Sequence, residues 1–132
     1  MGNAFITITG INGYYGKNPF KIDRVLRIVK EPDNRHDAEA IRVELPFIDT
    51  VGYVANSVGT VYAGTESAGK LYDKIGEYAY AQVMFVTHSS VIALVLSPEE
   101  VEVDKTEKAE EAVIPKREIK KPQGTVNKIG FI

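Results

Sequence analysis

The sequence predicts a mainly β protein, a small barrel of about six strands with one or two short helices. Short runs rich in β-branched residues recur along the chain, several of them alternate apolar and polar side chains, and clusters of turn-forming residues separate them. With 132 residues, the chain is long enough for one hydrophobic core and too short for two ordinary domains. The predicted strands cover residues 4–9, 23–30, 39–45, 50–55, 80–88 and 91–96.

A turn-rich loop follows the first predicted strand. Gly10 and Gly13 break the strand, and Tyr14 and Tyr15 come directly after them in a segment that continues to Pro19. Two adjacent tyrosines are therefore predicted on a loop. At the mouth of a barrel, such side chains offer a ring for stacking and a hydroxyl for hydrogen bonding.

The most informative stretch is residues 30–53, which predicts a hairpin with a polar mouth. An acidic and amide-rich turn at residues 31–37 precedes a strand in which Ile41 and Val43 share one face. The next strand contains Gly52. A glycine inside a strand indicates a bulge or the close approach of another backbone.

A short helix is predicted between the fourth and fifth strands. Thr65 or Ser67 can cap its first turn, and Gly76 can end it. We expect this helix to plug one end of the barrel. The last two strands form a hairpin through a turn at residues 88–90, and the strand at residues 91–96 is apolar throughout, which is typical of a fully buried strand.

The composition changes near the end of the barrel, which predicts two parts, a barrel at residues 1–98 and a charged arm at residues 99–132. The arm is rich in acidic and basic residues, with a short strand expected at Val101 and Val103. Its end, residues 125–132, is apolar again. We expect this end to dock on the barrel or on a partner by adding a strand.

Charge and composition limit the classes of function. A formal net charge of −2 argues against strong, non-specific binding to nucleic acid. The absence of cysteine excludes disulfides, thiolate zinc sites and thiol nucleophiles. No apolar run is long enough to span a bilayer, and the N-terminus lacks the pattern of a signal peptide. We therefore expect a soluble, cytoplasmic protein that does not associate with membranes.

Motifs that suggest catalysis are incomplete. Residues 64–70 (GTESAGK) have the glycine and lysine spacing of a phosphate-binding loop, but Leu71 replaces the magnesium-binding Ser or Thr. His36 and Asp37 could form half of a metal site, yet a role for Asp37 in capping backbone amides of the turn is favoured. His88 beside two serines is not a hydrolytic triad. We expect a protein without enzymatic activity, cofactor or metal.

One stretch resembles a known family. The pattern E-P-D-N-x-x-D-x-x-A-I-x-V at residues 31–43, followed by V-G-Y-V at residues 51–54, is similar to the HIRAN domain, and the resemblance covers roughly residues 4–96. That module occurs at the N-terminus of some Swi/Snf-type ATPases of replication-fork remodelling and DNA repair, and as a stand-alone bacterial protein. The resemblance implies an OB-like β-barrel that captures the 3′ end of single-stranded DNA.

The resemblance also implies roles for individual residues. In the family, paired tyrosines stack on terminal bases, an aspartate receives the terminal hydroxyl, and basic groups hold phosphate; in this chain we expect Arg35, beside the pocket, to lie near phosphate. The chain departs from the family in two places: an asparagine stands near the position of a lysine, and residues 88–91 of the last hairpin offer no aromatic ring. The implied DNA-binding residues are Tyr14, Tyr15, Arg35, His36, Asp37, Tyr53 and Asn56.

An alternative of a different class is a protein-interaction scaffold that does not bind DNA. Here the barrel is a support, and the C-terminal arm recruits a partner protein. The acidic average charge, the missing lysine and the apolar end TVNKIGFI favour this alternative.

Overall fold

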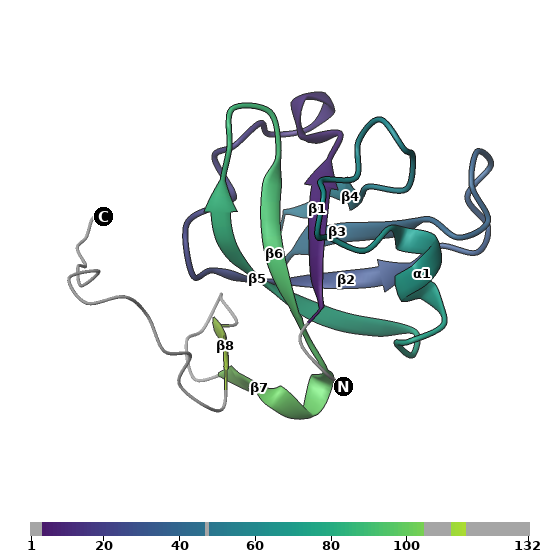
Figure 1. Ribbon diagram of the computed structural model, residues 1–132. Helices are drawn as coiled ribbons and strands as arrows, with labels where there is room; N and C mark the ends of the chain where they lie inside the picture. The colour runs from purple at the N-terminus through teal and green to yellow at the C-terminus, as the bar shows by residue number, and fades with distance from the viewer. Residues whose placement is uncertain (1–3, 47, 105–111, 116–132) are drawn as a thin grey trace.

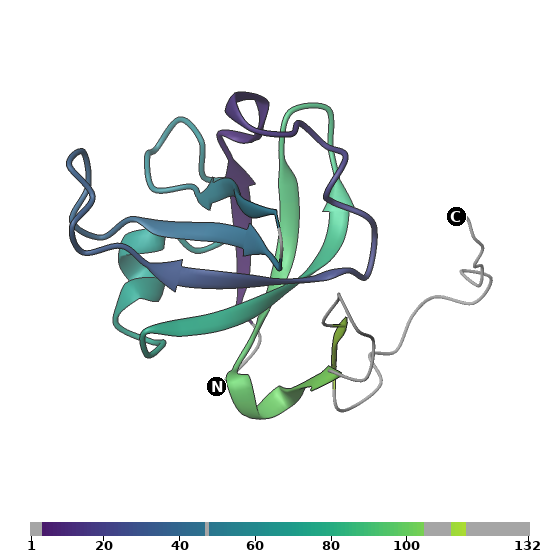
Figure 2. The same cartoon turned by 180° about the vertical axis from the view of Figure 1, so that it is seen from behind.

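The computed structural model describes residues 4–46, 48–104 and 112–115 (Figure 1). Six antiparallel strands close into a barrel in the order β1-β4-β3-β2-β5-β6, which confirms the predicted mainly β barrel. Figure 2 shows β2 and β3 from the opposite side. The strands of the barrel are β1 (Phe5–Thr9), β2 (Val25–Lys30), β3 (Ile41–Leu45), β4 (Asp49–Val54), β5 (Tyr78–Val86) and β6 (Val91–Leu96).

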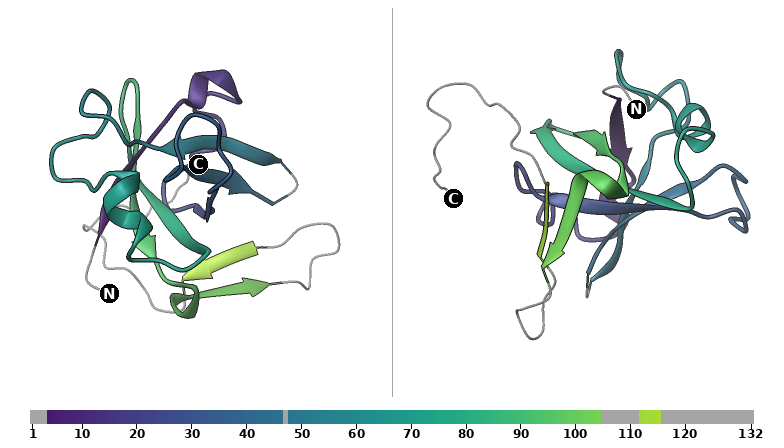
Figure 3. Two further views of the ribbon diagram at one scale, coloured as in Figure 1. Left: turned by 90° about the vertical axis from the view of Figure 1, so that its right-hand side faces the viewer. Right: turned by 90° about the horizontal axis from the view of Figure 1, so that it is seen from below.

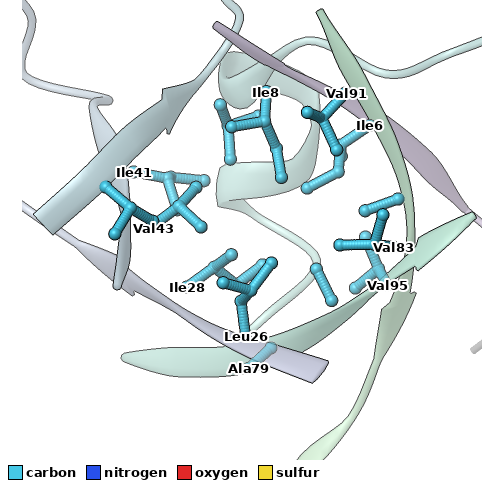
Figure 4. Packing of buried hydrophobic residues seen from close by; sticks show 14 of the residues in the cluster. Ile6, Ile8, Leu26, Ile28, Ile41, Val43, Ala79, Val83, Val91 and Val95 are labelled. Atoms are coloured by element: carbon cyan, nitrogen blue, oxygen red, sulfur yellow. The ribbon is translucent and has the colours of Figure 1, made fainter. Parts of the chain in front are cut away.

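Alternation along the strands builds the core. Apolar side chains of all six strands point into the barrel, where they pack around its axis (Figure 4). Strand β6 is buried along its whole length, as predicted, because its second face is covered as well. The fully buried side chains at the centre include Ile6, Ile8, Leu26, Ile28, Ile41, Val43, Val83 and Val91.

Gly52 lies at a bulge and at a close backbone approach, and both predictions for it are confirmed. The register of β3 and β4 shifts after the pair Val43 and Gly52. A Cβ at Gly52 would lie 3.0 Å from Ile8 Cγ2 and 3.1 Å from the carbonyl oxygen of Thr9. Only glycine lets β4 pass this close to the end of β1 without displacing a neighbour.

The short helix α1 (Ala68–Tyr72) closes one end of the barrel, as predicted. Of the two proposed caps, Ser67 is the one observed, and its side chain accepts a hydrogen bond from the Lys70 amide at 3.2 Å. Ala68 and Leu71 are buried in the barrel core. The helix ends at Tyr72, four residues before Gly76, so the predicted end was wrong.

The β5–β6 hairpin turns slightly earlier than predicted. Strand β5 begins and ends two residues before the expected range of 80–88. Thr87 closes the turn, because its amide donates to the Ser90 carbonyl at 2.8 Å and its hydroxyl accepts from the Ser90 amide at 2.9 Å. These bonds close the hairpin beyond its last strand pair, Val86 and Val91.

A second apolar layer covers the outside of β5 and β6. The 3-10 helix η2 (Pro98–Glu100) leads into β7 (Val101–Asp104), and Val101 is buried against Tyr80, Leu94 and Leu96. The strand expected at Val101 and Val103 is therefore confirmed. Strand β7 pairs with β8 (Ala112–Pro115), which the sequence did not predict.

The rest of the predicted arm, residues 105–111 and 116–132, lies outside the described residues, and so does the apolar end at residues 125–132. The division of the chain at residue 98 stays a prediction. Among the described residues, none of the helices has the length and hydrophobicity that a membrane-spanning helix requires.

Candidate nucleic-acid interface

The turn between β2 and β3 is held by its own side chains. The side-chain oxygen of Asn34 accepts hydrogen bonds from the amides of His36 at 2.8 Å and Asp37 at 3.1 Å. Asp37 Oδ1 accepts from the Glu39 amide at 2.9 Å. The predicted role of Asp37 in capping backbone amides is confirmed. Asn and Asp suit this turn because their short side chains can satisfy nearby backbone amides.

Glu31 joins this turn to the wall of the barrel. Its Oε1 accepts from the Tyr53 hydroxyl and from Asn34 Nδ2, both at 2.9 Å, and its Oε2 lies 3.3 Å from Arg42 Nη1. Partial burial raises the pKa of the Glu31 carboxyl, but the three hydrogen bonds outweigh burial and hold the pKa below its ordinary value. Burial and the bond to Glu31 raise the pKa of Tyr53 to about 12.

A chain of ion pairs continues from Glu31 across the outer face of the barrel. Arg42 Nε donates to Glu44 Oε1 at 3.1 Å, and Arg27 Nη2 lies 2.7 Å from Glu44 Oε2. Cross-strand pairing of β2, β3 and β4 places these side chains next to one another. The two arginines are therefore matched by two glutamates and offer little net positive charge.

The tyrosine loop lies beside β4. Ile11, in the 3-10 helix η1 (Ile11–Gly13), is buried and anchors the loop, and Gly16 adopts the left-handed conformation. The rings of Tyr14 and Tyr53 are 6.4 Å apart between centroids. Tyr14 is 45% exposed and Tyr15 is 53% exposed. The prediction that both tyrosines lie on a loop is confirmed.

Asp37 is paired with Asn56, which follows β4. Asn56 Nδ2 donates to Asp37 Oδ2 at 2.7 Å, and Asn56 Oδ1 accepts from the Gly69 amide in α1 at 2.8 Å. Each Asp37 oxygen thus accepts one hydrogen bond from the described residues. Since an ionised carboxylate has about four acceptor positions, Asp37 keeps capacity for a ligand.

The structure connects four of the seven predicted site residues. Tyr14 contacts Tyr53, Tyr53 is joined through Glu31 and Asn34 to the turn that holds Asp37, and Asp37 binds Asn56. The left view of Figure 3 shows the turn of residues 31–40 end-on, with η1 above it. The remaining three, Tyr15, Arg35 and His36, are exposed.

The backbone amide of His36 takes part in the turn. The side chains of Arg35 and His36 make no hydrogen bond or ion pair with other described residues. The role of Arg35 near phosphate stays a prediction. Among the described residues, no group of three potential metal ligands comes together.

Two features were not predicted, one at the site and one on the β5–β6 hairpin. Glu31 was recognised as part of the sequence pattern but not as the residue that links the turn to Tyr53. Phe85, just before the turn at residues 88–91, supplies an aromatic ring that is 59% exposed. The apolar run from Met84 to Val86 could have predicted an exposed apolar side chain here. Successive strand residues point to opposite faces, so the three cannot all face one core.

Comparison with known families found a match over part of the chain. The family model described as HIRAN domain matches residues 1–63. The resemblance to the HIRAN domain is confirmed over these residues, and its expected extension to residue 96 stays a prediction. The matched residues run from the start of the chain through β4 and include all seven predicted site residues. A comparison with curated proteins and one with solved structures found no match. The HIRAN match suggests a nucleic-acid-binding module.

Proposed function

We propose that the protein binds the 3′ end of single-stranded DNA and acts by binding alone, without catalysing a reaction. The proposed site, called the mouth below, consists of Tyr14, Tyr15, Asp37, Tyr53 and Asn56. The observation that carries the proposal is the connected path from the exposed Tyr14 through Tyr53, Glu31 and Asn34 to Asp37, a carboxylate with unused acceptor positions.

Exposed tyrosines suit unpaired bases. Stacking of a base on an aromatic ring contributes about 1–3 kcal/mol and tolerates any base. Tyr14 and Tyr15 expose about half of their surface. Tyr53 contributes its ring, because its hydroxyl is already bound to Glu31. The tyrosines therefore supply affinity without sequence preference.

Asp37 supplies the preference for an end. A 3′-hydroxyl can donate a hydrogen bond to the carboxylate, whereas a 3′-phosphate brings a negative charge to it. Hydrogen bonds to charged groups contribute about 1.5–3 kcal/mol, so the loss of one weakens binding by about tenfold or more.

Electrostatic attraction to the DNA backbone contributes little here. The net charge is −2, and Arg27 and Arg42 are paired with Glu44 and Glu31. Arg35, which has no ion pair among the described side chains, is the proposed phosphate contact. For single strands the logarithm of affinity falls with the logarithm of salt concentration by about 0.7 per phosphate contact. We expect the salt dependence of DNA binding to correspond to one or two phosphate contacts.

Fluorescence anisotropy at low salt tests the proposal. Two labelled single strands of one sequence are compared, one ending in a 3′-hydroxyl and the other in a 3′-phosphate. We expect the hydroxyl-ended strand to bind about tenfold more tightly. Equal affinities, or no binding of either strand, would overturn end recognition. In the protein-partner alternative, neither strand binds and the arm at residues 99–132 recruits a protein.

A further inference from the structure

Asn56 is exposed, yet both polar atoms of its amide group are used. It joins two segments that are distant in sequence, the turn at Asp37 and the helix at Gly69, by bonds of 2.7 and 2.8 Å. The backbone beside it is fixed as well: the Ala55 amide donates to the Thr7 carbonyl, and the Ala55 carbonyl accepts from the Ala68 amide. Asn56 therefore occupies a defined position.

The chemistry of its partners determines which way the amide points. The Gly69 amide is a donor, so it needs the oxygen of Asn56, and an ionised Asp37 is an acceptor, so it needs the nitrogen. Helix α1 is anchored in the core by Ala68 and Leu71. The Asn56 nitrogen is thus directed at Asp37 Oδ2 from a rigid support.

The helix comes close to the turn at this point. A Cβ at Gly69 would lie 2.8 Å from Glu39 Oε1 and 3.3 Å from Asn56 Oδ1. The side chain that donates to Asp37 Oδ2 is a neutral amide, and among the described residues no positively charged side chain of the helix takes part in this bond. Asn56 orients the Asp37 carboxylate but does not neutralise it.

We propose that Asn56 is a positioning residue that sets the preference of the mouth for a 3′-hydroxyl over a 3′-phosphate. It holds the Asp37 carboxylate with its remaining acceptor positions available, and it adds no positive charge that would tolerate a phosphate. This inference rests on the proposed function, because it concerns the same bound end.

The test is the ratio of the two affinities, for 3′-hydroxyl and 3′-phosphate strands, in Asn56→Lys and in a matched control. The control is Val58→Lys, which adds the same charge in the same loop at a side chain that is 99% exposed. In Asn56→Lys we expect tighter binding of the 3′-phosphate strand. The affinity for the 3′-hydroxyl strand divided by that for the 3′-phosphate strand should be about fivefold lower than in the wild type. In Val58→Lys both affinities should rise together and leave the ratio unchanged.

A second variant, Asn56→Ala, removes the donor to Asp37 without adding charge. We expect it to weaken binding of the 3′-hydroxyl strand and to leave binding of the 3′-phosphate strand unchanged. Thermal melting of each variant confirms that it is folded. If the wild type prefers the hydroxyl end but both Asn56 variants keep its ratio, the role of Asn56 is overturned while the proposed function stands. If the wild type binds the two strands equally well, both the role of Asn56 and the proposed function are overturned.

Discussion

The two ends of the turn between β2 and β3 carry similar carboxylates in different surroundings. Glu31, at the start, accepts three hydrogen bonds from the turn and from the barrel wall. Asp37, later in the turn, accepts one bond at each oxygen and lies next to Asn56. The first carboxylate is used by the fold, and the second keeps acceptor positions that a ligand can use.

Within one short segment, some side chains are needed for stability and others are available to bind a ligand. A residue that satisfies several protein donors is needed for stability, because its removal leaves those donors without a partner. A residue with unused acceptors contributes less to stability and more to binding. Substitutions at the two ends of the turn should therefore separate stability from binding.

The largest effect is expected for Glu31→Ala. The substitution removes the acceptor of Asn34, Tyr53 and Arg42, and we expect the free energy of unfolding to fall by about 1–3 kcal/mol. Urea denaturation measures it. The matched control is Asp33→Ala in the same turn, where the side chain is exposed and we expect a change within about 0.5 kcal/mol. Equal losses in the two variants would contradict the structural role of Glu31.

An intermediate effect is expected for Tyr14→Ala, in binding and not in stability. Loss of one stacked base should weaken binding of the hydroxyl-ended strand by about 1–3 kcal/mol. Fluorescence anisotropy measures it, with Tyr78→Ala as the control. Tyr78 is similarly exposed, at 41%, but lies on β5, away from the tyrosine loop. If Tyr78→Ala weakens binding as much as Tyr14→Ala does, the mouth is not the binding site.

The smallest effect is expected for Tyr53→Phe, which removes the hydroxyl bound to Glu31 and keeps the ring. DNA binding should be unchanged, and stability at neutral pH should fall by about 1 kcal/mol. The pKa of Tyr53 is raised from 10.0 to about 12. Its stabilising contribution is therefore complete below pH 10 and is lost as the pH rises through about 12.

Urea denaturation at a series of alkaline pH values checks this prediction. The difference in free energy of unfolding between wild type and Tyr53→Phe should shrink across that window. A difference that stays constant to the top of the window would show that the hydroxyl is not held by Glu31.

The strands and the local turn could be predicted from sequence because their signals are local. Alternation over a few residues predicts β3, and Asn34 and Asp37 bind backbone amides within three positions along the chain. Gly52, a glycine inside a strand, likewise predicted the bulge and the close backbone approach from its own position. The HIRAN pattern lies in the same segment, and the family model matches residues 1–63 around it.

Contacts that depend on barrel closure could not be predicted in this way. Asn56 and Asp37 are 19 positions apart, and nothing in either neighbourhood indicates that they bind each other. Tyr14 reaches Tyr53 only because β1 pairs with β4. The burial of Val101 likewise depends on the outer faces of β5 and β6, which a charged stretch of sequence does not reveal.

Competition between linear and circular DNA shows whether the mouth binds a strand end. A labelled strand with a 3′-hydroxyl is bound to the full chain at low salt, and unlabelled competitors of one sequence, linear or closed into a circle, are added. The circle has the same bases and phosphates but no end. We predict that the linear strand displaces the label about tenfold more effectively. Equal displacement by the circle would contradict end recognition.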